Sequence, residues 1–449
     1  MVSASAPTGV LSWDRADLAH RLERAVPYRR AGQLTRMSGL EVCARGVEGA
    51  IGDLFWVHRR RVEGADPLPA EVIAVGDGEV RLLPLGGLDG LAVGDWIEPA
   101  GTRLKLEVTP QLAGRVLDAL GRPIDGKGPL AGRRSRIDID RAVPNPMERQ
   151  RITEPLSLGV RAIDTLLPCG RGQRIGIFAG SGVGKSTLLG MLARGANADV
   201  VVVGLVGERG REVREFLEDD LGPEGAARAT VVVATSDEPA LLRLRAAMTA
   251  TRIAEWYADQ GLDVLLLMDS LTRFAMAQRE VGLAAGEPPT VRGYTPSVFN
   301  ALPKLLERTG PQPRGSITAL YTVLVEGDDL TEPITDHARS ILDGHIVLSR
   351  RMAAAGHYPT IDALESVSRL ATKVCTPEQL ATASRLRRLL AALEESRDLI
   401  EIGAYVPGTN PLTDEALLRK DKLLGFLQQP RDEVCPADEA WRRLEEVLR

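Results

Sequence analysis

The sequence predicts an α/β protein in which a mainly parallel sheet lies between helix layers, with a small β-barrel before it and a helical domain after it. Three features predict this order. A glycine-rich loop at residues 178–187 lies between a short apolar strand and a helix, further near-continuous apolar runs follow it, and short alternating runs precede it. Near-continuous apolar runs are typical of strands buried on both faces, as in parallel sheets covered by helices.

The first hundred residues contain two different patterns. Residues 1–30 include one short amphipathic segment, 18–26, and are expected to form an N-terminal appendage with a helix as its candidate structure. Residues 31–104 alternate apolar and polar side chains in short runs, and turn residues such as Asp77-Gly78 separate these runs. The runs are residues 39–42, 71–75 and 80–83. This pattern predicts a small β-barrel over residues 31–104.

The middle of the chain alternates apolar strands with helical segments. The expected strands are residues 174–178, 200–206, 230–233, 264–268, 316–325 and 345–348. From about residue 376 the leucines recur at helical spacing, which predicts positions that face a core. We therefore place the α/β domain at residues 105–375 and the helical domain at residues 376–449.

The loop at residues 178–187 has the pattern of a phosphate-binding P-loop. Its glycines allow a tight turn, and its N–H groups and the following helix N-terminus point at the negative charge. Lys185 would reach the β- and γ-phosphates, and the Ser186 hydroxyl would hold Mg²⁺. Ala179 stands where the strict pattern has glycine, so a chance glycine-rich turn is the alternative. The candidate nucleotide-binding residues of the loop are Gly180, Ser181, Gly182, Val183, Gly184, Lys185, Ser186 and Thr187.

Two carboxylates end apolar strands, at the edge where parallel sheets bind ligands. Asp269 is expected to anchor Mg²⁺, and the alternative is that it caps the next helix. Glu208 would polarise the water that attacks the γ-phosphate, and the alternative is a surface acid paired with Arg209 or Arg211. We count Arg209 with Glu208 and Lys185 among the candidate catalytic residues.

Composition limits the classes of function. The chain has 449 residues, of which 44% are hydrophobic and 4% aromatic, so it has a sizeable aliphatic core. With 56 Lys and Arg against 61 Asp and Glu, the net charge of -5 makes broad nucleic-acid binding an unfavourable hypothesis. The four cysteines lie far apart, which argues against a zinc site or a disulfide framework and fits a reducing cytosol. No apolar run approaches the length of a membrane span, so membrane contact is expected to be only peripheral.

Several motifs together resemble the F1-type rotary ATPases, the ATP synthase alpha and beta subunits and their relatives. They are residues 179–187, 207–212, 269–275, 343–348 and 358–362. Within that superfamily the chain most resembles the type III secretion ATPases, because residues 269–289 read DSLTRFAMAQREVGLAAGEPP and residues 292–299 read RGYTPSVF. Residues 402–405, IGAY, are more similar to flagellar protein-export ATPases than to injectisome ATPases. The resemblance covers residues from roughly 31 to 425.

The resemblance implies a RecA-like P-loop ATPase core, with ATP and Mg²⁺ as its ligands. It assigns phosphate binding to Lys185, Mg²⁺ binding to Ser186 and Asp269, and the catalytic carboxylate to Glu208. A-G-S-G is a common opening of this family's loop, so Ala179 is compatible with it.

Two further residues acquire roles only through the resemblance. Arg369 matches the arginine finger that one subunit inserts into its neighbour's site, whereas composition alone suggests a surface ion pair. Tyr358 matches a position whose ring lies against adenine, and a packed core tyrosine is the alternative. Related catalytic and noncatalytic subunits both carry an arginine at the position of Arg369, so this residue alone does not establish a homohexamer.

The resemblance also implies partners. It predicts a homohexameric ring that uses the barrel domain for oligomerisation and lies at the cytoplasmic face of the inner membrane. The expected partners are a stator-like regulatory protein at the N-terminus, a stalk-like coiled coil in the ring pore, an export-gate membrane protein, and export substrates with their chaperones. Nucleic acid is not among them.

Three alternatives remain at the level of sequence. The nearest is the ATPase of a virulence injectisome, and a second is a rotary ATP synthase subunit that needs a distinct partner chain. The third is a ring-shaped RNA translocase, which would need exposed aromatic side chains on a basic front domain. The front domain offers only Phe55 and Trp56 beside the run Arg59-Arg60-Arg61, with Trp96 elsewhere.

Overall fold

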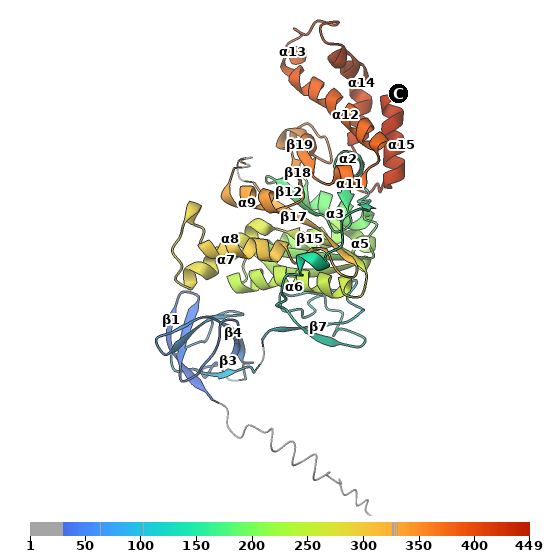
Figure 1. Cartoon of the computed structure of the whole chain (residues 1–449). Helices are drawn as coiled ribbons and strands as arrows, with labels where there is room; N and C mark the ends of the chain where they lie inside the picture. The colour runs from blue at the N-terminus through green and yellow to red at the C-terminus, as the bar shows by residue number, and fades with distance from the viewer. Residues whose placement is uncertain (1–29, 63, 102, 326, 328, 330) are drawn as a thin grey trace, which may run out of the picture.

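The computed structural model describes residues 30–449 except 63, 102, 326, 328 and 330. The predicted appendage, with its segment 18–26, therefore lies outside the described residues apart from residue 30. Figure 1 shows a β-barrel at one end, a central α/β domain, and a helical domain at the other end. This order confirms the predicted fold class.

Six antiparallel strands close the barrel in the order β1-β2-β5-β4-β3-β6. They are β1 (Gly32–Ser38), β2 (Glu41–Arg45), β3 (Leu54–His58), β4 (Leu68–Gly76), β5 (Glu79–Pro84) and β6 (Trp96–Pro99). Asp77 and Gly78 both have positive φ, 54° and 72°, and form the predicted turn between β4 and β5. Of the alternating run at residues 39–42, Glu41 and Val42 begin β2, whereas Gly39, with a φ of 58°, and Leu40 form the turn between β1 and β2.

The central sheet has the strand order β19-β18-β12-β17-β15-β13-β14-β8, and β16 pairs with β17 at the side. The strands are β8 (Val116–Leu117), β12 (Arg174–Ala179), β13 (Val200–Glu208), β14 (Ala229–Thr235), β15 (Asp263–Asp269), β16 (Gly310–Pro311), β17 (Ser316–Leu324), β18 (Gly344–Leu348) and β19 (Ile361–Ser368). All neighbours are parallel except that β19 is antiparallel to β18 and β16 to β17. The carboxyl ends of the parallel strands consequently share one edge.

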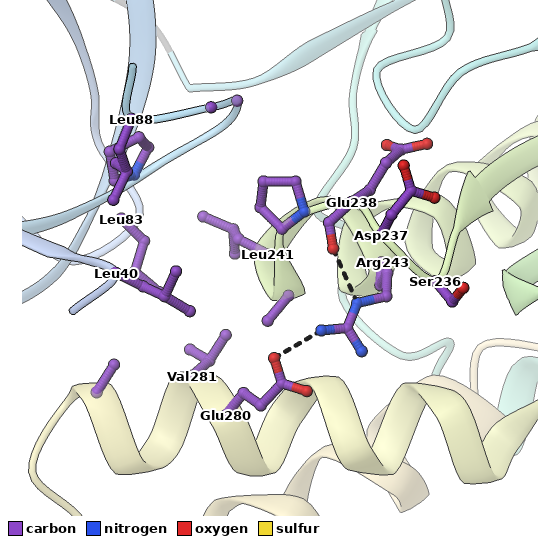
Figure 2. A pocket seen from close by; sticks show the side chains of 16 residues that line it. Leu40, Leu83, Leu88, Ser236, Asp237, Glu238, Leu241, Arg243, Glu280 and Val281 are labelled. Carbon is purple, nitrogen blue, oxygen red and sulfur yellow. Dashed lines mark hydrogen bonds and ion pairs between the residues drawn. The ribbon is translucent and has the colours of Figure 1, made fainter. Parts of the chain in front are cut away.

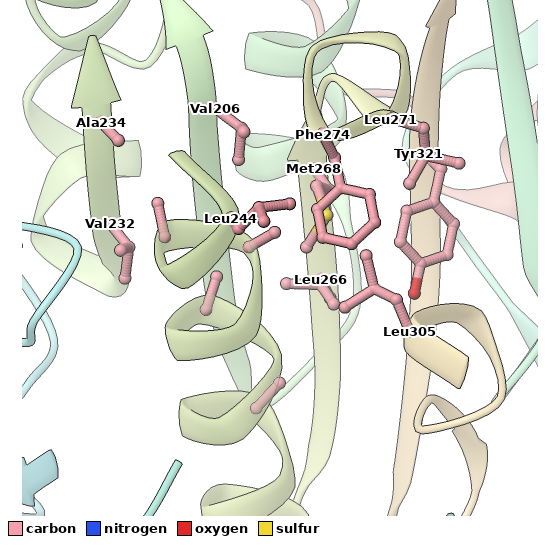
Figure 3. Packing of buried hydrophobic residues seen from close by; sticks show 14 of the residues in the cluster. Val206, Val232, Ala234, Leu244, Leu266, Met268, Leu271, Phe274, Leu305 and Tyr321 are labelled. Atoms are coloured by element: carbon pink, nitrogen blue, oxygen red, sulfur yellow. The ribbon is translucent and has the colours of Figure 1, made fainter. Parts of the chain in front are cut away.

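Alternate residues of these strands enter two separate cores. Val202 and Val206 pack toward α6 (Ala240–Ala258), α7 (Leu271–Ala284) and α8 (Pro296–Leu306), the face seen in Figure 3. Val201 and Val203 pack on the other face, with α3 (Lys185–Gly195). Burial of both faces explains why the strands read as continuous apolar runs in the sequence.

The C-terminal region is helical from residue 377 onward, as predicted. Its helices are α12 (Pro377–Glu395), α13 (Arg397–Glu401), α14 (Pro411–Leu427) and α15 (Ala437–Leu448). Thr376 and Gln379 form a capping box at the start of α12. Leu386, Leu389 and Leu423 belong to the same core as α3, so the helical domain packs directly on the α/β domain.

The remaining elements connect these layers. They are β7 (Lys105–Val108), β9 (Ser135–Asp138), η1 (Pro146–Glu148), β10 (Pro155–Leu156), α2 (Arg161–Leu166), β11 (Cys169–Gly170), α4 (Gly210–Glu215), the π-helical turn η2 (Phe216–Asp220), α5 (Gly222–Arg228), η3 (Val291–Gly293), α9 (Pro333–Ile341), α10 (Arg350–Ala354) and α11 (Ala371–Val374). Across the part of the chain that the structure describes, none of the helices combines the length and the apolar character of a membrane span.

Two arginines fix the barrel to the central domain. Arg245 of α6 donates to Glu71 of β4, with 3.0 Å between Nε and Oε2, and to Asp140, with 3.2 Å between Nη1 and Oδ1. Arg81 of β5 pairs with Glu41 and donates to the carbonyl of Ala284 at the end of α7, at 2.7 Å. The side chains of Arg245 and Glu71 are only 6% and 10% exposed, so this pair is held away from water.

A cavity of about 340 Å³ lies beside these contacts, between the barrel and the central domain (Figure 2). Leu40, Leu83 and Leu88 line its barrel side, and Leu241 and Val281 line its side on α6 and α7. The barrel and the central domain thus meet through buried ion pairs at one place and around a cavity with leucine side chains and charged residues such as Arg243 and Glu280 at another.

Arg245→Met should lower the free energy of unfolding by about 3–5 kcal/mol, because it leaves the Glu71 carboxylate buried without its cation. Urea unfolding of the purified chain measures this loss. The double variant with Glu71→Leu as well should regain most of the stability, because it removes both charges. Wild-type stability in the single variant would show that the pair does not fasten the barrel.

Candidate functional site

The carboxyl edge of the central sheet brings the sequence-predicted residues together. β12 ends at Ala179 and leads into the P-loop, β13 ends at Glu208, and β15 ends at Asp269. β17 lies between β12 and β15, and β13 lies on the far side of β15. Lys185, Glu208 and Asp269 therefore line one site, although Lys185 and Asp269 are 84 positions apart in the sequence.

The P-loop has the backbone that phosphate binding requires. Gly182 and Gly184 have φ of 76° and 86°, in the left-handed region that glycine adopts readily. Gly184 is also the N-cap of α3 and supplies no side-chain cap for the first turn. The N–H groups of that turn are therefore available to an anion, with the positive end of the helix dipole behind them.

Lys185 is held between the two predicted carboxylates. Its Nζ lies 2.5 Å from Oδ1 of Asp269 and 3.4 Å from Oε1 of Glu208. Burial alone would lower the pKa of Lys185, but the charges of Asp269 and Glu208 outweigh that effect and raise its pKa. The ammonium group is therefore charged wherever this site operates.

Glu208 is partly buried in this cluster, with a side chain 15% exposed. Burial, and then the charge of Asp269, raise the pKa of Glu208 to about 7, while Lys185 opposes the shift. A hydrogen bond with Glu212 on α4 raises the pKa further. The structure pairs Glu208 with Lys185, whereas Arg209 and Arg211 contact Glu212, each at 3.6 Å.

The residues predicted to hold Mg²⁺ fit that ion chemically. Asp269 supplies a carboxylate, and Ser186, in the first turn of α3, supplies a hydroxyl. Mg²⁺ prefers oxygen ligands of this kind. Oδ1 of Asp269 accepts from Lys185 and from the Thr322 hydroxyl, the latter at 2.7 Å. Asp269 does not cap α7, because Ser270 does so by accepting from the N–H of Arg273.

Two arginines lie close to the Glu208 strand end. Arg273 packs against Gly207, where an added Cβ would come within 3.0 Å of the Arg273 Cβ. The Nε of Arg273 is buried without a hydrogen-bond partner among the described residues. The side chain of Arg209 is 74% exposed and has Glu212 as its ion-pair partner. Arg209 thus faces solvent, while Arg273 is held in place beside the site.

Tyr358 lies against the P-loop, as a base-stacking position requires. A Cβ added at Gly184 would lie 3.5 Å from two ring carbons of Tyr358. The residue as a whole is 47% exposed. Two residues later, the buried Thr360 hydroxyl donates to the carbonyl of Val183 at 2.7 Å. The packed-core alternative for Tyr358 is therefore disfavoured by its exposure.

Arg369 is not part of the same site within one chain. It follows β19, whose end pairs with the start of β18, Ser368 opposite Gly344. The start of β18 lies at the amino edge of the parallel sheet, because the end of β18 at Leu348 pairs with Ala179 before the P-loop. Arg369 is exposed and donates to the Arg339 carbonyl at 3.0 Å, with no carboxylate partner among the described residues.

Sequence reasoning missed Thr322, Arg273 and Thr360. Thr322 had a detectable signal, a hydroxyl residue near the end of a mainly apolar strand, whereas Thr360 precedes a strand that carries several polar residues and gave none. Arg273 gave no such signal, because its position beside Gly207 depends on the pairing of β13 with β15.

Two family models match the chain. The ATP synthase alpha/beta family, nucleotide-binding domain, matches residues 159–368, and the T3SS EscN ATPase C-terminal domain matches residues 375–446. The "Flagellum-specific ATP synthase" of Bacillus subtilis is 50% identical over 419 residues, 93% of this chain and 95% of that protein. The "Type 3 secretion system ATPase" of Sinorhizobium fredii is 51% identical over 408 residues, 91% of this chain and 90% of that protein.

A solved structure agrees with these relatives. The assembled ATPase EscN from the enteropathogenic E. coli type III secretion system has a TM-score of 0.87 and 46% identity, covering 93% of this chain and 100% of that chain. EscN in complex with its central stalk EscO has a TM-score of 0.85 and 45% identity, again covering 93% of this chain and 100% of that chain. The P-loop, the two strand-end carboxylates and the identity to these relatives agree, and the chain belongs to the family of flagellum-specific ATP synthases and type 3 secretion system ATPases.

Proposed function

We propose that the chain hydrolyses ATP with Mg²⁺ to drive the export of flagellar proteins. The observation that supports ATP hydrolysis is the placement of Lys185, at the end of the P-loop, between Asp269 and Glu208. Relatives named flagellum-specific ATP synthase match 93% or more of the chain at about half identity, which supports the flagellar system.

The chain's own residues divide the work of phosphoryl transfer. The N–H groups of the P-loop and Lys185 bind the phosphates and offset charge that develops on the γ-phosphoryl group. Glu208, when ionised, accepts a hydrogen bond from the attacking water and orients it in line with the bond that breaks. Ser186 and Asp269 would hold Mg²⁺, which neutralises phosphate charge when bound. Tyr358 would stack on adenine.

The position of Arg369 favours a site shared between subunits. Arg369 lies at the amino edge of the sheet, away from the P-loop of its own chain. In a ring where this edge faces the P-loop of the neighbouring subunit, Arg369 would act as an arginine finger in the neighbour's site. The exposed Arg209 of that neighbour would lie near the same phosphates. We infer a homohexamer, with the barrel at 31–104 as its oligomerisation domain, the ATPase domain at 105–375 and the helical domain at 376–449.

We propose the partners from the relatives and the family resemblance. The EscN structure includes the central stalk EscO, which supports a stalk-like coiled coil in the pore of this ring. We further propose a stator-like regulator at the N-terminus, an export-gate membrane protein, and export substrates with their chaperones. The ring would act in the cytoplasm, peripherally at the inner membrane.

An RNA translocase is disfavoured by the barrel itself. Phe55 is buried in the barrel core, 1% exposed, and is not available to stack on a base. The Trp96 ring stacks on His58, with 3.6 Å between ring centroids. In the described part of the barrel, Phe55 and Trp96 therefore do not offer the open aromatic surface that single-stranded RNA binding uses.

Lys185→Ala should reduce the ATP turnover number on the order of a hundred- to a thousand-fold, because it removes a charge that contacts the transferred phosphate. A steady-state phosphate-release assay measures the change, with circular dichroism to confirm folding. Lys105→Ala, a change to a half-exposed surface lysine, is the matched control and should leave turnover unchanged. Turnover near that of the wild type in folded Lys185→Ala protein would reject the assigned loop.

The kcat/KM for ATP should fall as pH decreases through about 7, because protonation removes the negative charge of Glu208 and leaves a weaker hydrogen-bond acceptor for the attacking water. Glu208→Gln should bind ATP but lose most turnover together with this pH dependence. Glu212→Gln should move the midpoint to lower pH, because Glu212 contributes to the raised pKa of Glu208. A pH profile that is unchanged in Glu208→Gln would assign the titration to another group.

Mixing Arg369→Ala subunits with Glu208→Gln subunits should restore part of the ATPase activity that each variant lacks alone. At some interfaces the Glu208→Gln chain supplies the arginine and the Arg369→Ala chain supplies the carboxylate, which completes a site. A finger supplied in trans contributes on the order of a thousand-fold or more in rate, so partial repair is measurable. Mixtures that co-assemble without any recovery of ATPase activity would argue that Arg369 acts within its own chain, or that ATP hydrolysis by the ring needs every site intact.

A further inference from the structure

The strand between the P-loop strand and the Asp269 strand carries a buried threonine that faces the site. Thr322 lies on β17, two residues before the strand ends, and is 0% exposed. Its Oγ1 lies 2.7 Å from Oδ1 of Asp269 and 3.3 Å from the Met268 carbonyl. A hydroxyl has one proton to donate, and the shorter contact to a charged acceptor is the stronger one.

A hydroxyl group at this position needs a reason. The rest of β17 near it is apolar, and valine has nearly the same shape and suits a buried strand better. Burying a hydroxyl without a partner costs free energy, and of the two acceptors within reach of Thr322 the Asp269 carboxylate is the nearer and stronger one. The pair is therefore mutual: Asp269 satisfies Thr322, and Thr322 fixes the orientation of the Asp269 carboxylate.

Both protein donors reach the same carboxylate oxygen. Oδ1 of Asp269 accepts from Lys185 and from Thr322, and among the described residues no donor to Oδ2 occurs. The two bonds come from different elements, since Lys185 is the first residue of α3 and Thr322 lies on β17. If ATP phosphates draw the Lys185 ammonium toward themselves, Thr322 is the donor that still holds Oδ1.

We propose that Thr322 is a positioning residue that holds the Asp269 carboxylate so that its second oxygen, Oδ2, faces Mg²⁺ or a water bound to it. This inference rests on the proposed function, because it assumes that Asp269 serves the metal. Residues that orient a metal ligand typically change metal affinity or activity about 10- to 100-fold when they are removed.

The experiment compares fluorescent mant-ADP binding with Mg²⁺ and with EDTA. Thr322→Val removes only the hydroxyl and keeps the branched shape, so its mant-ADP affinity in EDTA should stay within about twofold of the wild type. The increase in affinity that Mg²⁺ gives should shrink about tenfold or more. Thr322→Ser keeps the hydroxyl and should retain most of that increase.

Thr318→Val is the matched control. Thr318 lies four residues earlier on β17, is equally buried, and accepts from the N–H of Gly172 at 2.8 Å, away from the site. It should lower stability while leaving the Mg²⁺ effect intact. A full Mg²⁺ effect in Thr322→Val, or an equal loss in Thr318→Val, would overturn the positioning role. A wild-type chain whose nucleotide binding ignores Mg²⁺ would overturn the assignment of Asp269 in the proposed function, a separate failure.

Discussion

The ion pairs of Lys185 with Asp269 and Glu208 are the interaction on which the site depends. Two carboxylates this close together and this far from water would repel each other, and the ammonium group between them offsets that repulsion. The compensation is incomplete: burial first, and then the charge of Asp269, raise the pKa of Glu208 to about 7 although Lys185 opposes the shift. The site thus holds one acid that titrates near neutral pH beside a lysine that stays charged.

This cluster exists because of the sheet. Parallel pairing places the carboxyl ends of β12, β15 and β13 at one edge, and the two buried faces hold these strands in register. The supporting contacts are short and come from neighbouring elements: Thr322 bonds Asp269, and Thr360 bonds the P-loop at Val183. Rigid strands hold the charged groups at fixed distances, which electrostatic stabilisation of a transferred phosphoryl group requires.

The two edges of the same sheet differ in what they present. The carboxyl edge holds the P-loop and its carboxylates, and the amino edge holds Arg369 beyond the end of β19. One chain cannot bring these edges together, whereas neighbouring copies in a ring can. The barrel is fixed to α6 and α7 by Arg245 and Arg81, so a ring formed by barrels would also set the orientation of the ATPase domains.

The sequence by itself determined the fold class and most of the site. Apolar runs indicate strands buried on both faces, and the P-loop pattern together with strand-ending acids makes Lys185, Glu208 and Asp269 candidate site residues, because local spacing is enough to describe a loop or a strand end. The alternating run at residues 39–42 did not separate the turn at Gly39 and Leu40 from the strand that begins at Glu41. The sequence also left open which cation pairs with Glu208.

Only the tertiary structure decided which side chains meet. Thr322 and Asp269 are 53 residues apart, and their hydrogen bond depends on β17 lying beside β15. The place of Arg273 beside Gly207, and of Arg369 at the opposite edge from Lys185, depends in the same way on strand order and direction. Strand order is set by packing of the whole sheet, and residue spacing along the chain does not encode it.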